Sequence, residues 1–406
     1  MPPAAGPIGS EERIPVLDIV RGVALLGIFV MNIPGFSHSL FAGAGGIEPY
    51  ATPLDRAAAF LREALFGGKF NSMFSLLFGI GFTLQLGRLR ACGPAQATLI
   101  YVRRLVVLFA IGLVHAGLLW SGDVLVVYAL LGLALLLLQR VPDSVLIALI
   151  VACLMLPGVF EAWRPVLVPP QAEALAAFDY QDLEASNNAA FGEGSFLEAV
   201  RETWRMFAWG YGTTMGRWSY ALFYAHMASG LLLGYVVGRR GWLRRADGRD
   251  PAIARLQRAA LLVAIAGALI SLAGRPGPFF DAVSPAWLFA TTTMHALGRL
   301  ALMAFYVLTI VRLAAQPAWR RLLQPFAVAG RMPLTNYLLQ TALGLFVFYG
   351  WGLGWWGRVG PAAELLLAPA LFFAIQWPLS AWWLGRHARG PLEHAWRVLT
   401  YGRSVA

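Results

Sequence analysis

The feature that most restricts the fold of this chain is a series of ten long apolar segments joined by polar stretches. Each segment is long enough to cross the ~30 Å hydrocarbon core of a bilayer as an α-helix, which takes about 20 residues. Only 13% of the residues are charged, whereas a soluble domain has about 25%. The sequence therefore predicts an all-α fold, a polytopic integral membrane helical bundle. The predicted spans are residues 14–36, 69–89, 101–120, 123–140, 144–161, 218–238, 256–273, 292–312, 333–356 and 361–385.

The net charge of +11 is explained by membrane topology rather than by nucleic-acid binding. The arginines stand at the ends of apolar runs, not in a stripe interleaved with stacking aromatic residues. Because cytoplasmic loops hold the excess of Lys and Arg, the arginine-rich loops around 88–104 and 239–258 are expected to be cytoplasmic. With ten spans, residues 1–13 and 386–406 then both lie in the cytoplasm.

The domain organisation follows from the spacing of the spans. We expect a single membrane domain, 1–406, made of two five-helix halves, 14–161 and 218–385. An extracytoplasmic loop, 162–217, separates them and should contain an amphipathic helix at about 194–208. This loop is either a solvated cap on the bundle or a lid that gates a substrate, and the sequence leaves both open. The two cysteines form no disulfide framework or zinc spacing, so no metal site is expected.

The stretch "GLVHAGLLWSGDVLVVYALLGL", residues 112–133, places two ionisable residues beside a turn between two spans. Such groups are functional by default inside a membrane, because burying them costs ~2.5 to 3.5 kcal/mol or more unless they are paired. A neutral His115 could move a proton, and Asp123 could orient its ring. The alternative is a hydrogen bond that only fastens the helix hairpin. Asn32 and Lys69 fall in the same outer layer, and Lys69 could equally be a snorkelling lysine.

A second polar layer lies at the cytoplasmic ends of the spans. Asp18 and Arg21 are three residues apart and can pair on one helix face, as either a helix tie or a coupling element. Glu393 and Arg397 are four apart and can do likewise. The remaining members of this layer are Arg103, Arg104, Arg331, Asn336 and Gln340.

Several stretches resemble the YeiB-like family of bacterial inner-membrane proteins, a domain of unknown function. They include "RIPVLDIVRGVALLGIFVMN", "KFNSMFSLLFGIGF", "GLLLGYVVGRRGWL", "GRMPLTNYLLQT" and "GPLEHAWRVLTYG", as well as the His115 hairpin, and they cover nearly the whole chain in order. That family is in turn similar to the transmembrane acyltransferases, the group that includes the lysosomal heparan-α-glucosaminide N-acetyltransferase. The shared cue is the opening "LDIVRGVALLGIFVMN". The resemblance implies a multi-pass protein of the bacterial inner membrane.

The resemblance also implies a reaction. A cytoplasmic acyl-CoA, such as acetyl-CoA, would be the co-substrate, with no permanently bound cofactor. Arg103, Arg104 and Arg331, with Asn336 and Gln340 beside them, would hold its phosphates. His115, oriented by Asp123, would deprotonate a periplasmic or lipid-linked acceptor, for example a glycan, while Lys69 or Asn32 would donate to the oxyanion.

Two other classes of function remain open from the sequence. The same buried groups suit a proton-coupled small-molecule transporter or exporter. A non-catalytic membrane scaffold would use them only to fix helix packing. In each case membrane lipids are the expected partners, and a homodimer is left open.

Overall fold

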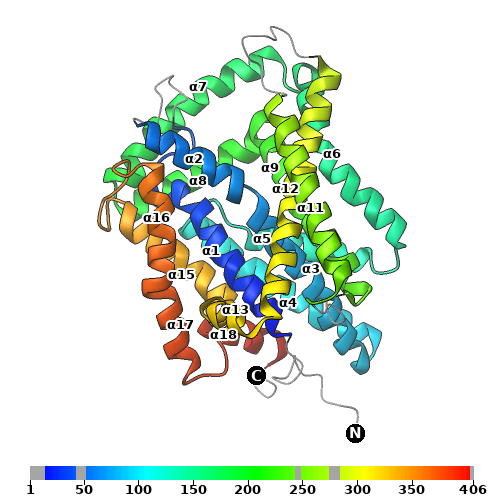
Figure 1. Ribbon diagram of the computed structural model, residues 1–406. Coiled ribbons are helices and arrows are strands. Elements are labelled where there is room, and N and C mark those ends of the chain that lie inside the picture. Colours follow the sequence, from blue (N-terminus) through cyan, green and yellow to red (C-terminus); the bar gives the residue numbers. More distant parts are fainter. Residues whose placement is uncertain (1–13, 43–51, 243–247, 274–283, 403–406) are drawn as a thin grey trace.

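The structure is a computed structural model that describes residues 14–42, 52–242, 248–273 and 284–402 (Figure 1). Throughout these ranges the regular structure is helical and no strand is present, so the predicted all-α fold is confirmed. The expected cytoplasmic segment 1–13 lies outside the described residues. The helices are α1 (Pro15–Ser37), α2 (Pro53–Phe66), α3 (Lys69–Leu89), α4 (Pro94–Leu118), α5 (Leu125–Leu137), α6 (Asp143–Leu167), α7 (Pro170–Asn187), α8 (Phe196–Gly212), α9 (Thr214–Arg239), α11 (Pro251–Ala273), α12 (Pro285–Ala314), α13 (Pro317–Leu322), α14 (Gln324–Gly330), α15 (Pro333–Phe348), α16 (Pro361–Leu371), α17 (Trp377–Leu384) and α18 (Pro391–Tyr401).

Eight helical segments of the described chain are long and apolar enough to cross a membrane, which makes this a multi-pass membrane protein. They are Pro15–Ser37, Pro53–Leu89, Pro94–Leu118, Asp143–Leu167, Thr214–Arg239, Pro251–Leu272, Pro285–Ala314 and Pro361–Leu384. The other two predicted spans are shorter helices. The span expected at 123–140 is α5, with 13 residues, and the one expected at 333–356 is α15, with 16 residues. Residues after Phe348 form a loop in which Gly354 and Gly357 adopt positive φ angles of 66° and 68°, so a helix cannot continue there.

The connection between the two halves of the chain is itself helical. The amphipathic helix predicted at 194–208 is α8, which begins with a capping box in which Ser195 and Glu198 exchange hydrogen bonds. The preceding helix α7 and the helix α2 were not predicted, because neither is apolar enough to be recognised as a span. In Figure 1, α7 crosses the end of the bundle opposite to α13 and α18.

Helix α1 packs against α3, α14, α15 and α16 at the centre of the fold. Its contact with α14 depends on two glycines that face each other. A Cβ on Gly22 would lie 1.9 Å from the carbonyl oxygen of Phe326, and one on Gly330 would lie 1.9 Å from that of Asp18. The two backbones therefore touch, which fixes the start of α1 beside Arg331.

The C-terminal helix α18 is attached to three other helices at the end of the bundle where α1 begins (Figure 1). Glu393 accepts hydrogen bonds from the first backbone N–H groups of α15, those of Leu334 (2.7 Å) and Thr335 (3.0 Å). Trp396 donates through its indole nitrogen to a carbonyl of α4, and Tyr401 accepts a 2.8 Å hydrogen bond from Gln85 of α3. The chain expected to be a simple cytoplasmic tail is thus part of the fold.

Candidate functional site

A cavity of about 370 Å³ lies between α1, α3, α4, α5, α15 and α18. Six arginines line it, against two carboxylates, those of Asp18 and Glu393. Asp18 forms a 2.6 Å ion pair with Arg21, as predicted from their spacing. Because positive charge remains in excess, the cavity suits an anionic ligand. The six arginines are Arg21, Arg88, Arg104, Arg331, Arg389 and Arg397.

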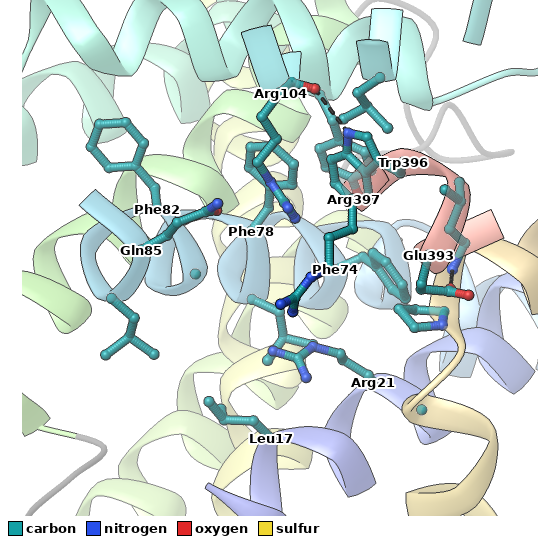
Figure 2. A pocket seen from close by; sticks show the side chains of 18 of the residues that line it. Leu17, Arg21, Phe74, Phe78, Phe82, Gln85, Arg104, Glu393, Trp396 and Arg397 are labelled. Carbon is teal, nitrogen blue, oxygen red and sulfur yellow. Dashed lines mark hydrogen bonds between the residues drawn. The ribbon is translucent and has the colours of Figure 1, made fainter. Parts of the chain in front are cut away.

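Arg104 is held in the cavity by an aromatic side chain rather than by an acid. Its guanidinium carbon lies 3.6 Å from the centroid of the Trp396 ring, and the Trp396 indole nitrogen donates a 2.9 Å hydrogen bond to the Arg104 carbonyl oxygen. No carboxylate of the described chain forms an ion pair with Arg104. Figure 2 shows the side chains of Arg21, Arg104 and Arg397 converging from α1, α4 and α18. The Arg104 charge is therefore available to a ligand.

Away from the arginines the cavity becomes apolar and aromatic. Phe74 and Phe78 of α3 line this half, together with leucines of α4 and α5. From Arg88 to Phe74 the cavity follows α3 for fourteen residues, which is about 21 Å of helix. Tyr128 and Tyr337 line its inner end. The shape is thus a charged entrance followed by a long apolar part.

His115 and Asp123 lie just beyond this inner end. His115 Nδ1 is 2.8 Å from Asp123 Oδ1, and its Nε2 is 2.9 Å from the hydroxyl of Thr341. The ring is 1% exposed, and its centroid is 5.3 Å from that of Tyr337, which does line the cavity. The Tyr337 hydroxyl accepts a 3.3 Å hydrogen bond from the backbone of Val124. The expected pairing of His115 with Asp123 is thus present, one residue layer away from the cavity.

The other two residues expected beside His115 lie elsewhere. Lys69 is buried and donates a 2.8 Å hydrogen bond to the carbonyl oxygen of Glu63, near the end of α2. The same carbonyl oxygen also accepts a 3.0 Å hydrogen bond from the Gly67 backbone, so Lys69 binds at the C-terminus of α2 rather than lining the cavity. Asn32 is half-buried in α1 and forms no side-chain hydrogen bond with the described residues. Neither side chain is bonded to His115 or Asp123.

The residues expected to bind phosphates divide into two groups. Arg104 and Arg331 line the cavity, but Arg103 is exposed on the other side of α4, because consecutive helical residues point about 100° apart. Asn336 and Gln340 are buried without lining the cavity. Asn336 donates to the Ala329 carbonyl and to Ser380, and Gln340 donates to the Leu25 carbonyl and to Gln376. These two amides fasten α15 to α1, α14 and the segment around α17.

Glu393 has a different partner from the one expected. The sequence spacing suggested an ion pair with Arg397, but the carboxylate caps α15, where the Thr335 hydroxyl adds a 2.6 Å hydrogen bond to the two backbone bonds. A negative charge at a helix N-terminus is favourable. Burial raises the pKa of Glu393 above its usual value, although the hydrogen bonds from Thr335 and Leu334 act in the opposite direction. Burial lowers the pKa of Arg397.

A buried ionic cluster lies at the opposite end of α1. The Glu364 carboxylate accepts hydrogen bonds from Ser37 and Arg62, and it is 3.3 Å from His38 Nδ1. The cluster joins α1, α2 and α16. Sequence reasoning missed it because Arg62 and Glu364 are more than 300 residues apart.

Sequence reasoning also missed several residues of the cavity and of the His115 site. Arg88 was assigned only to a loop, and Arg389, Trp396, Tyr337 and Thr341 were not singled out. For Tyr337 and Thr341 the sequence does contain a local pattern. In the stretch "TNYLLQT" they are four residues apart and so share one face of a helix.

These features define a class, the polytopic helical membrane proteins with an arginine-lined internal cavity. Residues 237–403 match the family described as "Protein of unknown function (DUF418)". Over 97% of its length the chain is 32% identical to the uncharacterized protein YxaH of Bacillus subtilis, covering 96% of that protein. It is 28% identical to the uncharacterized protein YeiB of Escherichia coli, over 96% of both chains. The chain belongs to this YeiB-like DUF418 family. No solved structure matches it.

Proposed function

We propose that this protein is a membrane-embedded acyltransferase of the bacterial inner membrane. It moves an acetyl-like acyl group from a cytoplasmic acyl-CoA to a hydroxyl or amine of a periplasmic or lipid-linked acceptor. The observation that carries the proposal is the arginine-lined cavity. Tyr337 lines its inner end, and the ring of His115 lies directly behind the ring of Tyr337.

The two halves of the cavity correspond to the two parts of an acyl-CoA. Arginines are the side chains that hold phosphate groups most specifically, through paired N–H donors. Arg104, Arg331 and Arg397 would bind the phosphates at the entrance. The narrow pantetheine arm would follow α3 inward to Tyr337, whose hydroxyl can donate to a polar atom, whereas the Tyr128 hydroxyl already donates to the Asn71 carbonyl oxygen. The volume of about 370 Å³ lies within the ~300–1,000 Å³ of small-molecule sites.

The group at the inner end can move a proton. With Asp123 ionised and the ring neutral, the carboxylate accepts the hydrogen on Nδ1 of His115, so Nε2 is a proton acceptor. Asp123 would stabilise the imidazolium that forms when Nε2 takes a proton. The Tyr337 hydroxyl has no acceptor among the described residues, so its hydrogen can be donated to an oxyanion at the end of the cavity. Tyr337 thus takes the role that the sequence suggested for Lys69 or Asn32.

The test uses the full chain in lipid nanodiscs with acetyl-CoA. We expect saturable acetyl-CoA binding and slow release of free CoA, which His115→Ala abolishes while acetyl-CoA still binds. His394→Ala is the matched control, because His394 is exposed on α18. Equal CoA release by wild type and His115→Ala would remove His115 from the reaction. Proton-coupled uptake into liposomes without any acyl donor, combined with no CoA release, would overturn the proposal in favour of a transporter.

A further inference from the structure

Resting on the proposed function, we propose that Thr341 is the nucleophile that carries the acyl group as an ester between the CoA donor and the acceptor. The acyl group would then cross from the cavity to the acceptor side in two transfers rather than one.

The arrangement has the order of a nucleophile, base and carboxylate. The Thr341 hydroxyl is 2.9 Å from Nε2 of His115, and Nδ1 of the same ring is 2.8 Å from Asp123. The second oxygen of Asp123 accepts a 2.8 Å hydrogen bond from the backbone of Val126, which fixes the carboxylate. Serine hydrolases activate a hydroxyl with the same three groups in the same order. Here they come from α15, α4 and the turn before α5.

The hydrogen bond of Thr341 differs from those of four other helical threonines in this protein. Thr203, Thr291, Thr309 and Thr400 each donate to the carbonyl oxygen four residues earlier, at 2.7 to 3.0 Å. That is the usual bond of a threonine within a helix. The only hydrogen bond of the Thr341 side chain within the described chain is to His115. Its hydroxyl is therefore directed at the base and not at its own helix.

Thr341 is placed to receive an acyl group from the cavity. It follows Tyr337 by four residues, so it lies on the same face of α15 and about 6 Å further from the arginines. Tyr337 lines the inner end of the cavity, and Thr341 is fully buried behind it. A thioester that extends past the Tyr337 ring would meet the Thr341 hydroxyl. Because Thr341 is fully buried, an ester formed on it would be shielded from bulk water.

Both transfers balance without a further reagent. In the first, the Thr341 hydroxyl gives its proton to His115, its oxygen bonds to the thioester carbon, and the carbon–sulfur bond breaks. The CoA thiolate takes the proton from His115 and leaves as free CoA. In the second, the acceptor hydroxyl or amine gives its proton to His115 and attacks the ester carbon. The bond to Thr341 breaks, and the threonine oxygen takes the proton back.

The test is a trapping experiment on the full chain in nanodiscs with radiolabelled acetyl-CoA and no acceptor. We expect a burst of one CoA per protein and one base-labile acetyl group on the peptide that contains Thr341. Thr341→Val, which keeps the shape and removes the hydroxyl, should lose the label and at least ~10³-fold of the rate while binding acetyl-CoA normally. Thr341→Ser should restore the label. Thr291→Val removes the hydroxyl of a buried threonine that donates to the carbonyl oxygen of Trp287. This variant should change neither the label nor the rate.

Each alternative outcome has a separate meaning. Full CoA release or acyl transfer by Thr341→Val, or a label on His115, would overturn the role of Thr341 and leave the acyltransferase proposal standing. Wild-type protein that neither binds acetyl-CoA nor releases CoA would overturn both.

Discussion

The Arg104 guanidinium carbon lies 3.6 Å from the centroid of the Trp396 ring, while its neighbour Arg103 is exposed on the other side of the same helix. The two consecutive arginines are therefore a natural pair for separating specific binding from general charge. Both changes to glutamine remove one positive charge at the same end of the protein, but only one of them alters the cavity.

Arg104→Gln should weaken acetyl-CoA binding by about 10- to 150-fold, because a hydrogen bond to a charged group contributes ~1.5–3 kcal/mol. Arg103→Gln should leave the Kd within about twofold at the same salt concentration. Isothermal titration of the nanodisc-embedded proteins measures both. Equal losses in the two variants would show that the arginines act only through the general surface potential.

Trp396→Leu should weaken acetyl-CoA binding, as Arg104→Gln does but to a smaller extent, although it leaves the positive charge of Arg104 in place. The stacking of an arginine on an aromatic ring contributes about 0.5–2 kcal/mol, so we expect acetyl-CoA to bind up to ~30-fold more weakly. Trp396→Phe keeps a ring under Arg104 but loses the hydrogen bond to its carbonyl oxygen. This variant should bind acetyl-CoA more tightly than Trp396→Leu. Identical affinities for the two variants would mean that the ring does not position Arg104.

Gly330→Ala tests the contact between α1 and α14. The added Cβ would lie 1.9 Å from the Asp18 carbonyl oxygen, so the backbones must separate. We expect a loss of ~1–3 kcal/mol in stability, seen as a lower thermal midpoint, and weaker acetyl-CoA binding because Arg331 moves with α14. Gly87→Ala is the matched control, since its Cβ meets open space in α3. It should be neutral or stabilising by up to ~1 kcal/mol.

Glu393 gives a prediction about pH. Because burial raises its pKa in the folded state above the ordinary 4.5, the folded protein binds this proton more tightly than the unfolded chain does. The stability that this group contributes is therefore fully present below pH 4.5 and is lost as the pH rises through the raised pKa. Relative to Glu393→Gln, the wild-type thermal midpoint should fall as the pH rises above 4.5. If the difference between the two thermal midpoints stays constant with pH, or grows in favour of wild type as the pH rises, Glu393 does not have a raised pKa.

The sequence predicted those parts of the fold that follow from local composition. Long apolar runs give membrane helices whatever their partners, so most spans were placed within a few residues. The two shorter helices were overestimated because apolar composition continues beyond Leu137, where α5 ends, and beyond Phe348, where α15 ends. Helix α2 was missed because it is amphipathic. The residues of its polar face make the segment as a whole less apolar than a membrane span.

The side-chain pairings of the candidate site were predictable only where the two residues are close in sequence. His115 and Asp123 are eight residues apart on one hairpin, and Asp18 and Arg21 share one helical turn. Thr341 lies 226 residues from His115, and Trp396 lies 292 from Arg104. No local pattern brings such residues together, since their contact depends on how α15 and α18 pack against α4.

Asp123→Asn separates an orienting role of the carboxylate from a purely structural one. The substitution keeps the size of the side chain and its bond to the Val126 backbone, but it removes the charge that stabilises a protonated His115. If His115 takes a proton in the reaction, kcat should fall by roughly 10²–10⁴-fold with little change in acetyl-CoA affinity. Asp143→Asn, which removes a charge from an ion pair with Arg240 and does not line the cavity, should leave kcat unchanged. If Asp123 only stabilises the hairpin between α4 and α5, the opposite result is expected. Asp123→Asn would then lower the thermal midpoint and leave the rate per folded molecule unchanged.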